Sequence, residues 1–278
     1  MKKHLKIALC VSGLMRDAKK SFMDMKDRLV IDGVDIDLFI HTWGPEDNFK
    51  DDKWGINAPE VISIKTQRVS STHFDFGEVS QSTDAKLFSL LAAKHGYKIK
   101  IDGIIKTIDE ILPVTEFKLE RVSVVQPELD EIKERFGPIG NGRGQYKQKW
   151  SPHNLSCWLY SLYMCNHIKN KYTKRNNIEY DLVIRSRTEL TFTKTITIDI
   201  YEQIKKKNLM GIPSGGDSVG LNDMFAIGRP DAIDWYCSIK DHYVPGTNPH
   251  QMFKKHLSKQ EILRFDMPMC LRNRSKSG

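Results

Sequence analysis

The chain has 278 residues, with 43 Lys and Arg against 35 Asp and Glu, and therefore carries a net charge of +8. A hydrophobic content of 40% and a charged content of 28% allow a buried core and exclude a disordered tail protein and a membrane protein. The length fits one large domain or two small ones, and we predict a single domain over residues 1–278. The positive charge indicates either an anionic partner or simply a basic enzyme.

The N-terminal segment combines a basic start with a short apolar run. The run Leu5 to Val11 is followed by Gly13 and Arg16, with no small-residue cleavage pattern, so it predicts a β-strand rather than a signal peptide. No apolar stretch is long enough to span a membrane, and the five cysteines contain no C-x-x-C pair. These features predict a cytoplasmic protein without a transmembrane segment.

The first two strands and the helix between them predict an α/β sheet. The apolar run Leu5 to Val11 is typical of a strand buried on both faces of a parallel sheet. From Asp17 the period becomes helical. The apolar positions of this helix are Ala18, Phe22, Met25 and Leu29. Val34 to His41 predicts the next strand, and a β-α-β opening is typical of a mostly parallel sheet flanked by helices.

Residues 44–149 are less regular, and we predict a variable insertion on the acceptor side of the domain. Within them, Glu60 to Lys65 predicts a strand and Asp84 to His95 a helix. Gly137 to Lys149 combines glycines with basic residues, which predicts a mobile loop that closes over a ligand.

The remaining chain alternates helices and strands again. Ser151 and Pro152 predict a helix start, because a hydroxyl N-cap and a proline at the first position both favour one. The apolar half of Tyr180 to Phe192 predicts a central strand. Further strands are predicted at Leu209 to Ile212, Met224 to Ile227 and Ile262 to Leu271, and helices at Asp231 to Tyr243 and His250 to Leu257.

The turn after the first strand is one candidate ligand site. In open α/β sheets, ligands bind at the carboxyl ends of the strands, where helix N-termini offer N–H groups to phosphate. Gly13, after Ser12, would allow close backbone approach, and Arg16 would supply a cation. Neither a P-loop nor a dinucleotide fingerprint is present. An ordinary turn with a surface arginine explains the same residues.

Two further candidates flank later strands. Arg185, Arg187 and Glu189 follow an apolar strand, where charges are costly unless they pair or face a cleft, so they form either an ion pair or an anion or metal site. Asn222 and Asp223 precede a short strand, where they would bind sugar hydroxyls, remove a proton or form an Asx turn.

Asn154 and Ser161 also could reach this cleft, because seven positions along a helix return to the same face. Helix capping explains Asn154 almost as well. The pair is therefore a weaker indication of a ligand site than the strand ends.

Taken in order, these motifs resemble a family of bacterial and viral glycosyltransferases with a GT-A-type fold. The matching pieces are the SG-x-x-R turn, DLFIHTW, the helix containing NLS, YDLVIRSRTEL and ND-x-FAIG. In that family an R-x-R-x-D segment ends the strand that carries the D-x-D motif of better-known GT-A enzymes. Here Glu189 stands in place of the last Asp, which puts dependence on Mn or Mg in doubt.

The resemblance implies a nucleotide-sugar donor over the first strand and over Arg185 to Glu189. It implies that Gly13 and Arg16 contact the nucleotide or its phosphates, that Arg187 and Glu189 lie beside the donor, and that Asn222 and Asp223 lie beside the reacting sugar or the acceptor. We predict Asp223 as the catalytic base, with Glu189 as the second catalytic candidate and as the metal ligand if there is one. Their places at the strand ends and on the helix face add Ser12, Arg185, Asn154 and Ser161 to the predicted donor-binding residues. The positive charge of the glycine-rich loop adds Arg143, Lys147 and Lys149 to Asn222 as predicted acceptor-binding residues.

The sequence thus predicts a glycosyltransferase that moves a sugar to a hydroxyl acceptor, in the cytoplasm or, for a viral source, the host cytoplasm. The acceptor is a glycan or a hydroxylated DNA base, as in phages that glycosylate their genomes. The alternative is a non-catalytic nucleic-acid-binding α/β module that uses the basic loop with Tyr146 and Trp150 as stacking platforms.

Overall fold

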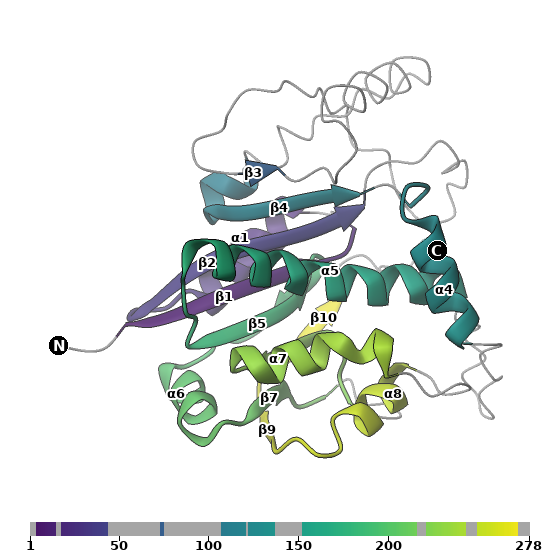
Figure 1. The fold of residues 1–278 in the computed structure, drawn as a ribbon. Helices are drawn as coiled ribbons and strands as arrows, with labels where there is room; N and C mark the ends of the chain where they lie inside the picture. Colours follow the sequence, from purple (N-terminus) through teal and green to yellow (C-terminus); the bar gives the residue numbers. More distant parts are fainter. Residues whose placement is uncertain are drawn as a thin grey trace, which may run out of the picture.

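The protein folds around an eight-stranded mixed sheet with the strand order β3-β4-β2-β1-β5-β8-β7-β9 (Figure 1). The computed structural model describes residues 4–14, 18–43, 73–74, 107–120, 122–136, 152–215, 221–242 and 249–271. All strands of the sheet run in one direction except β8, which is antiparallel to both of its neighbours. The α/β class with a mostly parallel sheet flanked by helices is confirmed.

The strands of the sheet are short and come from the whole length of the chain. They are β1 (Leu5–Ser12), β2 (Val34–Trp43), β3 (His73–Phe74), β4 (Val114–Glu120), β5 (Leu182–Arg187), β7 (Met210–Pro213), β8 (Phe225–Gly228) and β9 (Ile262–Phe265). A second, two-stranded antiparallel sheet joins β6 (Leu190–Phe192) to β10 (Met269–Leu271).

Helices cover both faces of the large sheet. They are α1 (Ala18–Leu29), α4 (Gln126–Phe136), α5 (Pro152–Asn176), α6 (Ile198–Lys207), α7 (Pro230–Cys237), the 3-10 helix η2 (Ser238–Asp241) and α8 (Pro249–His256). One core packs α1 and α6 on the sheet, and the other packs α4, α5, α7 and α8 on its opposite face (Figure 1). The strands are therefore apolar on both sides.

Alternation along β1 shows which side chains face which layer. Ile7 and Leu9 pack in the α1 core, whereas Ala8 and Cys10 pack in the α5 core. Ser12 continues the second set, so its side chain lies on the α5 face of the sheet. The same alternation determines which polar residues can meet on one face at the carboxyl end of the sheet.

Most of the predicted elements are present with shifts of one or two residues. The strand expected over Ile262 to Leu271 is two strands, because Pro268 cannot donate a hydrogen bond to a ladder and separates β9 from β10. The helix expected over Asp231 to Tyr243 becomes a 3-10 helix after Cys237. The strand and helix expected at 60–65 and 84–95 lie outside the described residues.

Part of the expected insertion belongs to the central sheet. Residues 114–120 form β4, which pairs in parallel with β2, and α4 packs against α5. Leu129 on α4 is fully buried in the α5 core. Within the described part of the chain, no helix combines the length and the apolarity needed to cross a lipid bilayer.

Candidate functional site

Polar side chains form a row across four neighbouring strands at the carboxyl end of the sheet. Ser12 on β1 lies in register with His41 on β2 and with Arg187 on β5, and His41 lies in register with Lys118 on β4. Ser12 and His41 share the α5 face, and Arg187 has the parity of Val183, which packs in that core. The strand order reverses between β2 and β5, with β1 as the pivot, so this row lies where open α/β sheets bind ligands.

The turn after β1 is fastened to both neighbouring strands. The Gly13 N–H donates to the carbonyl of His41 at 3.2 Å, and the Thr188 hydroxyl donates to the carbonyl of Leu14. Gly13 has φ +132°, and a Cβ there would lie 3.1 Å from the Thr188 hydroxyl oxygen. The glycine is therefore needed for backbone conformation and for the close approach of Thr188.

Arg187 and Glu189 form an ion pair at the end of β5. The Arg187 guanidinium, 27% exposed, donates to a carboxylate oxygen of Glu189, which is 8% exposed. Within the described residues, no group of three or more His, Cys, Asp or Glu could hold a metal ion. Because Glu189 is already bound to a guanidinium, these residues do not fit a divalent metal site.

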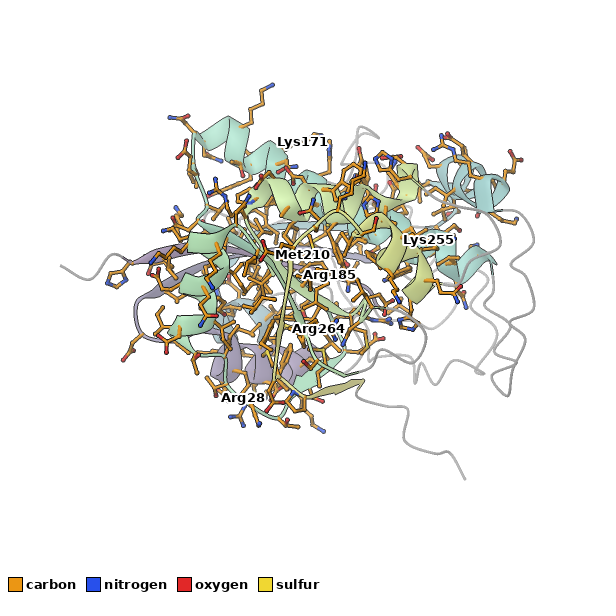
Figure 2. All side chains as sticks on the ribbon, turned by 90° about the horizontal axis from the view of Figure 1, so that it is seen from below. Arg28, Lys171, Arg185, Met210, Lys255 and Arg264 are labelled. Carbon is orange, nitrogen blue, oxygen red and sulfur yellow. The ribbon has the colours of Figure 1, made fainter. Side chains whose placement is uncertain are left out.

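Arg185 precedes Arg187 by two residues on the same face of β5 and is buried in the protein interior (Figure 2). Its guanidinium donates to the backbone carbonyl of Asp223, which also accepts a hydrogen bond from the Tyr236 hydroxyl at 3.1 Å. Its Nε and Nη2 atoms have no hydrogen-bond partner among the described residues. Arg185 thus contacts the segment that carries Asp223.

Asp223 is buried at the start of β8, and its carboxylate lies beside an imidazole. His250 Nδ1 is 3.4 Å from Asp223 Oδ1 and 3.0 Å from the carbonyl of Leu221. A carbonyl can only accept, so His250 Nδ1 carries a proton, and Asp223 lies near the same N–H. Asp223 therefore holds a carboxylate oxygen close to the Nδ1–H group of His250.

Asn222 anchors the turn before β8 rather than projecting from it. Its amide donates to the carbonyl of Gly215 at 3.1 Å, and its side-chain oxygen accepts from the Met224 N–H at 2.9 Å. This is the Asx turn that the sequence left as an alternative. Binding an acceptor hydroxyl through Asn222 would compete with these contacts.

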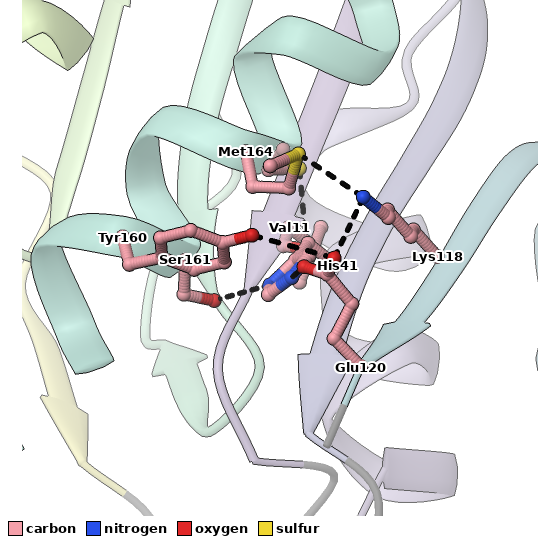
Figure 3. Close-up of polar contacts among 8 residues, drawn as sticks. Val11, His41, Lys118, Glu120, Tyr160, Ser161 and Met164 are labelled. Atoms are coloured by element: carbon pink, nitrogen blue, oxygen red, sulfur yellow. Dashed lines mark hydrogen bonds and ion pairs between the residues drawn. The ribbon is translucent and has the colours of Figure 1, made fainter. Parts of the chain in front are cut away.

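Ser161 belongs to a buried network around His41 (Figure 3). The Ser161 hydroxyl lies 2.7 Å from His41 Nδ1, and His41 Nε2 lies 2.8 Å from a carboxylate oxygen of Glu120. Lys118 Nζ is 2.7 Å from the other Glu120 oxygen, which also accepts from Tyr160 at 3.3 Å. The network joins β2, β4 and α5 beside the Gly13 turn.

The protonation states in this network follow from burial and charge. Burial lowers the pKa of His41, which is therefore neutral. Burial alone would raise the pKa of Glu120, but hydrogen bonds from His41 and Lys118 outweigh it and hold the pKa at about 2. The ionised Glu120 fixes the His41 proton on Nε2, so Ser161 donates to Nδ1. The arrangement resembles a Ser-His-acid triad, but Ser161 is only 1% exposed and is closed to substrate.

The other predicted site residues fall apart from this group or outside the described chain. Asn154 is exposed on the first turn of α5, away from the buried contacts that hold Ser161. Arg16 lies outside the described residues, as do the loop residues Arg143, Lys147 and Lys149. The described geometry therefore brings together Ser12, Gly13, Arg187 and Glu189 on one side, and Arg185, Asn222 and Asp223 on the other.

Sequence reasoning missed four residues that shape the site. Thr188 fastens the Gly13 turn, and His250 lies beside Asp223. His41 and Glu120 bind each other and fix the end of β2. A signal for His41 exists in the sequence, because a histidine directly follows the apolar run of β2 near its carboxyl end. For Glu120 the signal would have been β4 itself, which the sequence did not predict.

Comparison with known proteins gives similarity in structure and none in sequence. No family model matches the chain, and no curated protein matches its sequence. Among solved structures, the chain is similar to the crystal structure of mouse xyloside xylosyltransferase 1 in its apo form, with TM-score 0.38 and 8% sequence identity, over 95% of this chain and 85% of that one. At this TM-score and sequence identity, the likeness supports no conclusion about function.

Proposed function

We propose that the protein is a glycosyltransferase that moves a sugar from a nucleotide-sugar donor to a hydroxyl group of an acceptor. The observation that carries this proposal is the register of Ser12 with Arg187 at the reversal of strand order, which brings a glycine turn and a partly exposed guanidinium together at the carboxyl end of the sheet. A phosphate-bearing ligand fits such an edge. The sequence resemblance to GT-A-type glycosyltransferases specifies that ligand as a nucleotide sugar.

The donor side of the site is formed by the Gly13 turn and Arg187. A guanidinium has five N–H donors, so the bond to Glu189 leaves others for phosphate oxygens. Positive charge at this position stabilises the nucleoside diphosphate as it leaves. Glu189 keeps the guanidinium in place, which makes it a positioning residue rather than the base.

The acceptor side is formed by Asp223 and His250. A direct transfer needs a base within hydrogen-bond reach of the attacking hydroxyl, and Asp223 is the carboxylate held at the end of the sheet with an imidazole beside it. Arg185 and Tyr236 bind the Asp223 carbonyl and so position this carboxylate without touching the acceptor. The proton leaves the acceptor hydroxyl for Asp223 as the new glycosidic bond forms and the bond to the diphosphate breaks.

The acceptor is proposed to be either a glycan or a hydroxylated base in DNA, and salt dependence separates the two. The chain carries a net charge of +8. Transfer to DNA should weaken steeply with salt. For duplex DNA, a plot of log affinity against log salt concentration falls with a slope of about 0.9 for each phosphate that the protein neutralises. A neutral oligosaccharide acceptor should show almost no slope.

The proposed activity is tested by incubating the protein with a panel of nucleoside diphosphate sugars and measuring release of nucleoside diphosphate. At least one donor should be hydrolysed slowly without acceptor and faster with a hydroxyl acceptor. The matched variant pair is Asp223→Asn and Asp231→Asn, of which only the first removes a carboxylate from the site. Release that is absent for every donor, or equal in both variants, contradicts the proposal.

A further inference from the structure

A cavity lies between α7 and α8, away from the carboxyl end of the sheet. It measures about 290 Å³, and its floor includes Ile239 and Met252. His256, at the far end of α8, lines it, whereas His250 on the first turn of the same helix lies beside Asp223. Six residues of helix correspond to about 9 Å, so the cavity is distinct from the proposed transfer site.

Three flat rings meet at this cavity. The ring centroids of Trp235 and His256 are 4.5 Å apart with planes 13° from parallel, and those of Trp235 and His242 are 4.6 Å apart. The two imidazoles are 5.4 Å from each other. Rings on opposite faces of an indole would be about 7 Å apart, so both imidazoles lie over the same face of Trp235. Part of the indole is nevertheless exposed, and this surface is available to a further ring.

The indole is both exposed and held in place. Trp235 is 38% exposed and is the one aromatic side chain among the exposed large hydrophobic residues of the described ranges. Its Nε1–H donates to the carbonyl of His256 at 3.1 Å, and His256 Nε2–H donates to the carbonyl of Trp235 at 2.6 Å. These reciprocal bonds fix the ring plane, so stacking a ligand on it costs little side-chain entropy.

The remaining lining residues supply positive charge and little else that is polar. Lys255 and Lys259 line the cavity with Ser258, and Figure 2 shows Lys255 at the periphery of the molecule. Neither lysine forms an ion pair with any residue that the structure describes. No Asp, Glu, Asn or Gln is among the described lining residues, although these side chains bind the hydroxyl groups of neutral sugars. The cavity therefore favours a flat ring that carries an anionic group.

We infer that this cavity binds a nucleotide unit, with the base stacked on Trp235 and the phosphate beside Lys255 and Lys259. Bases stack on aromatic side chains with little dependence on sequence, and basic side chains follow the phosphates. The nucleotide unit can belong to a free mononucleotide or to a single strand of nucleic acid. This site is independent of the proposed sugar transfer, since it shares no residue with the sheet edge.

The test compares two nucleotide probes, a fluorescein-labelled twelve-nucleotide single-stranded DNA followed by anisotropy and thymidine monophosphate followed by calorimetry. An oligogalacturonate serves as an anionic competitor without a flat base. Trp235→Leu keeps an apolar side chain and removes the flat ring, so binding of the strand should weaken about tenfold. Trp235→Phe keeps a flat ring and should retain most of the affinity. Melting curves of both variants establish that they are folded.

The lysines are tested by their salt dependence. Replacing Lys255 and Lys259 by Ala should lower the slope of log affinity against log salt by about 1.4, at about 0.7 per phosphate of a single strand. The matched control replaces Lys206 and Lys207, exposed at the end of α6, by Ala and removes the same charge elsewhere. The control should leave the slope nearly unchanged.

Each outcome decides the inference. If both probes bind and both depend on Trp235, a free nucleotide is sufficient for binding to the cavity. If only the strand binds, the neighbouring phosphates of a strand are necessary for binding. Failure of both probes to bind, equal affinity in Trp235→Leu and wild type, or an equal change in the Lys206 and Lys207 control overturns it. Tighter binding of an oligogalacturonate than of the strand, with the same dependence on Trp235, overturns the nucleotide assignment.

Discussion

Ser12 and Arg187 lie opposite each other on adjacent parallel strands, although they come from opposite halves of the chain. β1 pairs with β2 on its other side, so the strand order turns at this point. The Gly13 turn follows Ser12 directly, and Thr188 follows Arg187 and binds that turn. One contact between distant segments therefore defines the position and shape of the proposed donor site.

Asp223→Asn should lower the rate of donor hydrolysis and transfer by roughly 100-fold or more, because a general base contributes about that much. The amide keeps the shape of the side chain beside His250, so the dissociation constant of the nucleotide sugar should change little. Steady-state kinetics and donor titration measure the two quantities separately. A wild-type rate in this variant would eliminate Asp223 as the base.

Gly13→Ala should lower the free energy of unfolding by about 1–3 kcal/mol, because an L-residue is strained at φ +132°. It should also weaken nucleotide-sugar binding, since the new methyl group lies 3.1 Å from the Thr188 oxygen and displaces it. Gly33→Ala is the matched control, with φ +85° and no atom within 4 Å of the new methyl group. Equal donor affinity in the two variants would show that the Gly13 turn does not shape the site.

Arg185→Met should separate stability from activity. The substitution removes a buried charge whose Nε and Nη2 lack partners among the described residues, so the free energy of unfolding should stay within about 1 kcal/mol of wild type or rise. Donor turnover should fall about tenfold or more, because the Asp223 carbonyl loses a donor and small displacements of a base are costly. The donor dissociation constant should not change. A raised dissociation constant would mean that Arg185 binds the donor directly.

The free energy of unfolding should fall with acidification in two steps. The pKa of His41 is lowered by burial, so below pH about 6.5 the unfolded state takes up a proton that the folded state does not. The pKa of Glu120 is held at about 2, so a second loss begins below its ordinary value of 4.5 and is complete near pH 2. Denaturant unfolding at several pH values measures both steps.

Glu120→Gln identifies the second step. It should lower stability at pH 7 and remove up to about 3.5 kcal/mol of the acid-dependent loss, at about 1.4 kcal/mol for each pKa unit. The matched control is Glu134→Gln on the exposed side of α4, which should keep the full dependence. An unaltered acid limb in Glu120→Gln would show that the network does not stabilise the fold.

The parts of the fold that the sequence predicts are those in which local pattern and tertiary packing agree. β1 and β2 bury the apolar residues of their runs, and α1 buries Phe22, Met25 and Leu29. β4 was missed because Glu116 and Lys118 give it a polar pattern, whereas Glu116 is only 4% exposed and pairs with Arg175 on α5 at 3.4 Å. The partner that makes this burial possible is remote in sequence, so no local pattern contains it.

The site divides in the same way. Arg187 and Asp223 were predicted because charges at the ends of apolar runs stand out, and the ion pair of Arg187 with Glu189 was one of the two alternatives left open. Thr188 and His250 act through contacts with Leu14 and Asp223, which only the register of distant strands and the docking of α8 bring within reach. Such contacts are tertiary and leave no spacing to detect.

The central claim is that a nucleotide sugar binds beside Ser12 and Arg187, and a thermal and denaturant unfolding screen with nucleoside diphosphate sugars tests it most directly. At about 100 times its dissociation constant, the correct donor should add about 2.7 kcal/mol to the free energy of unfolding. The variant Arg187→Met with Glu189→Gln removes both charges of the ion pair and should lose most of this gain. No stabilisation by any nucleotide sugar, or the same stabilisation in wild type and the double variant, would contradict the claim.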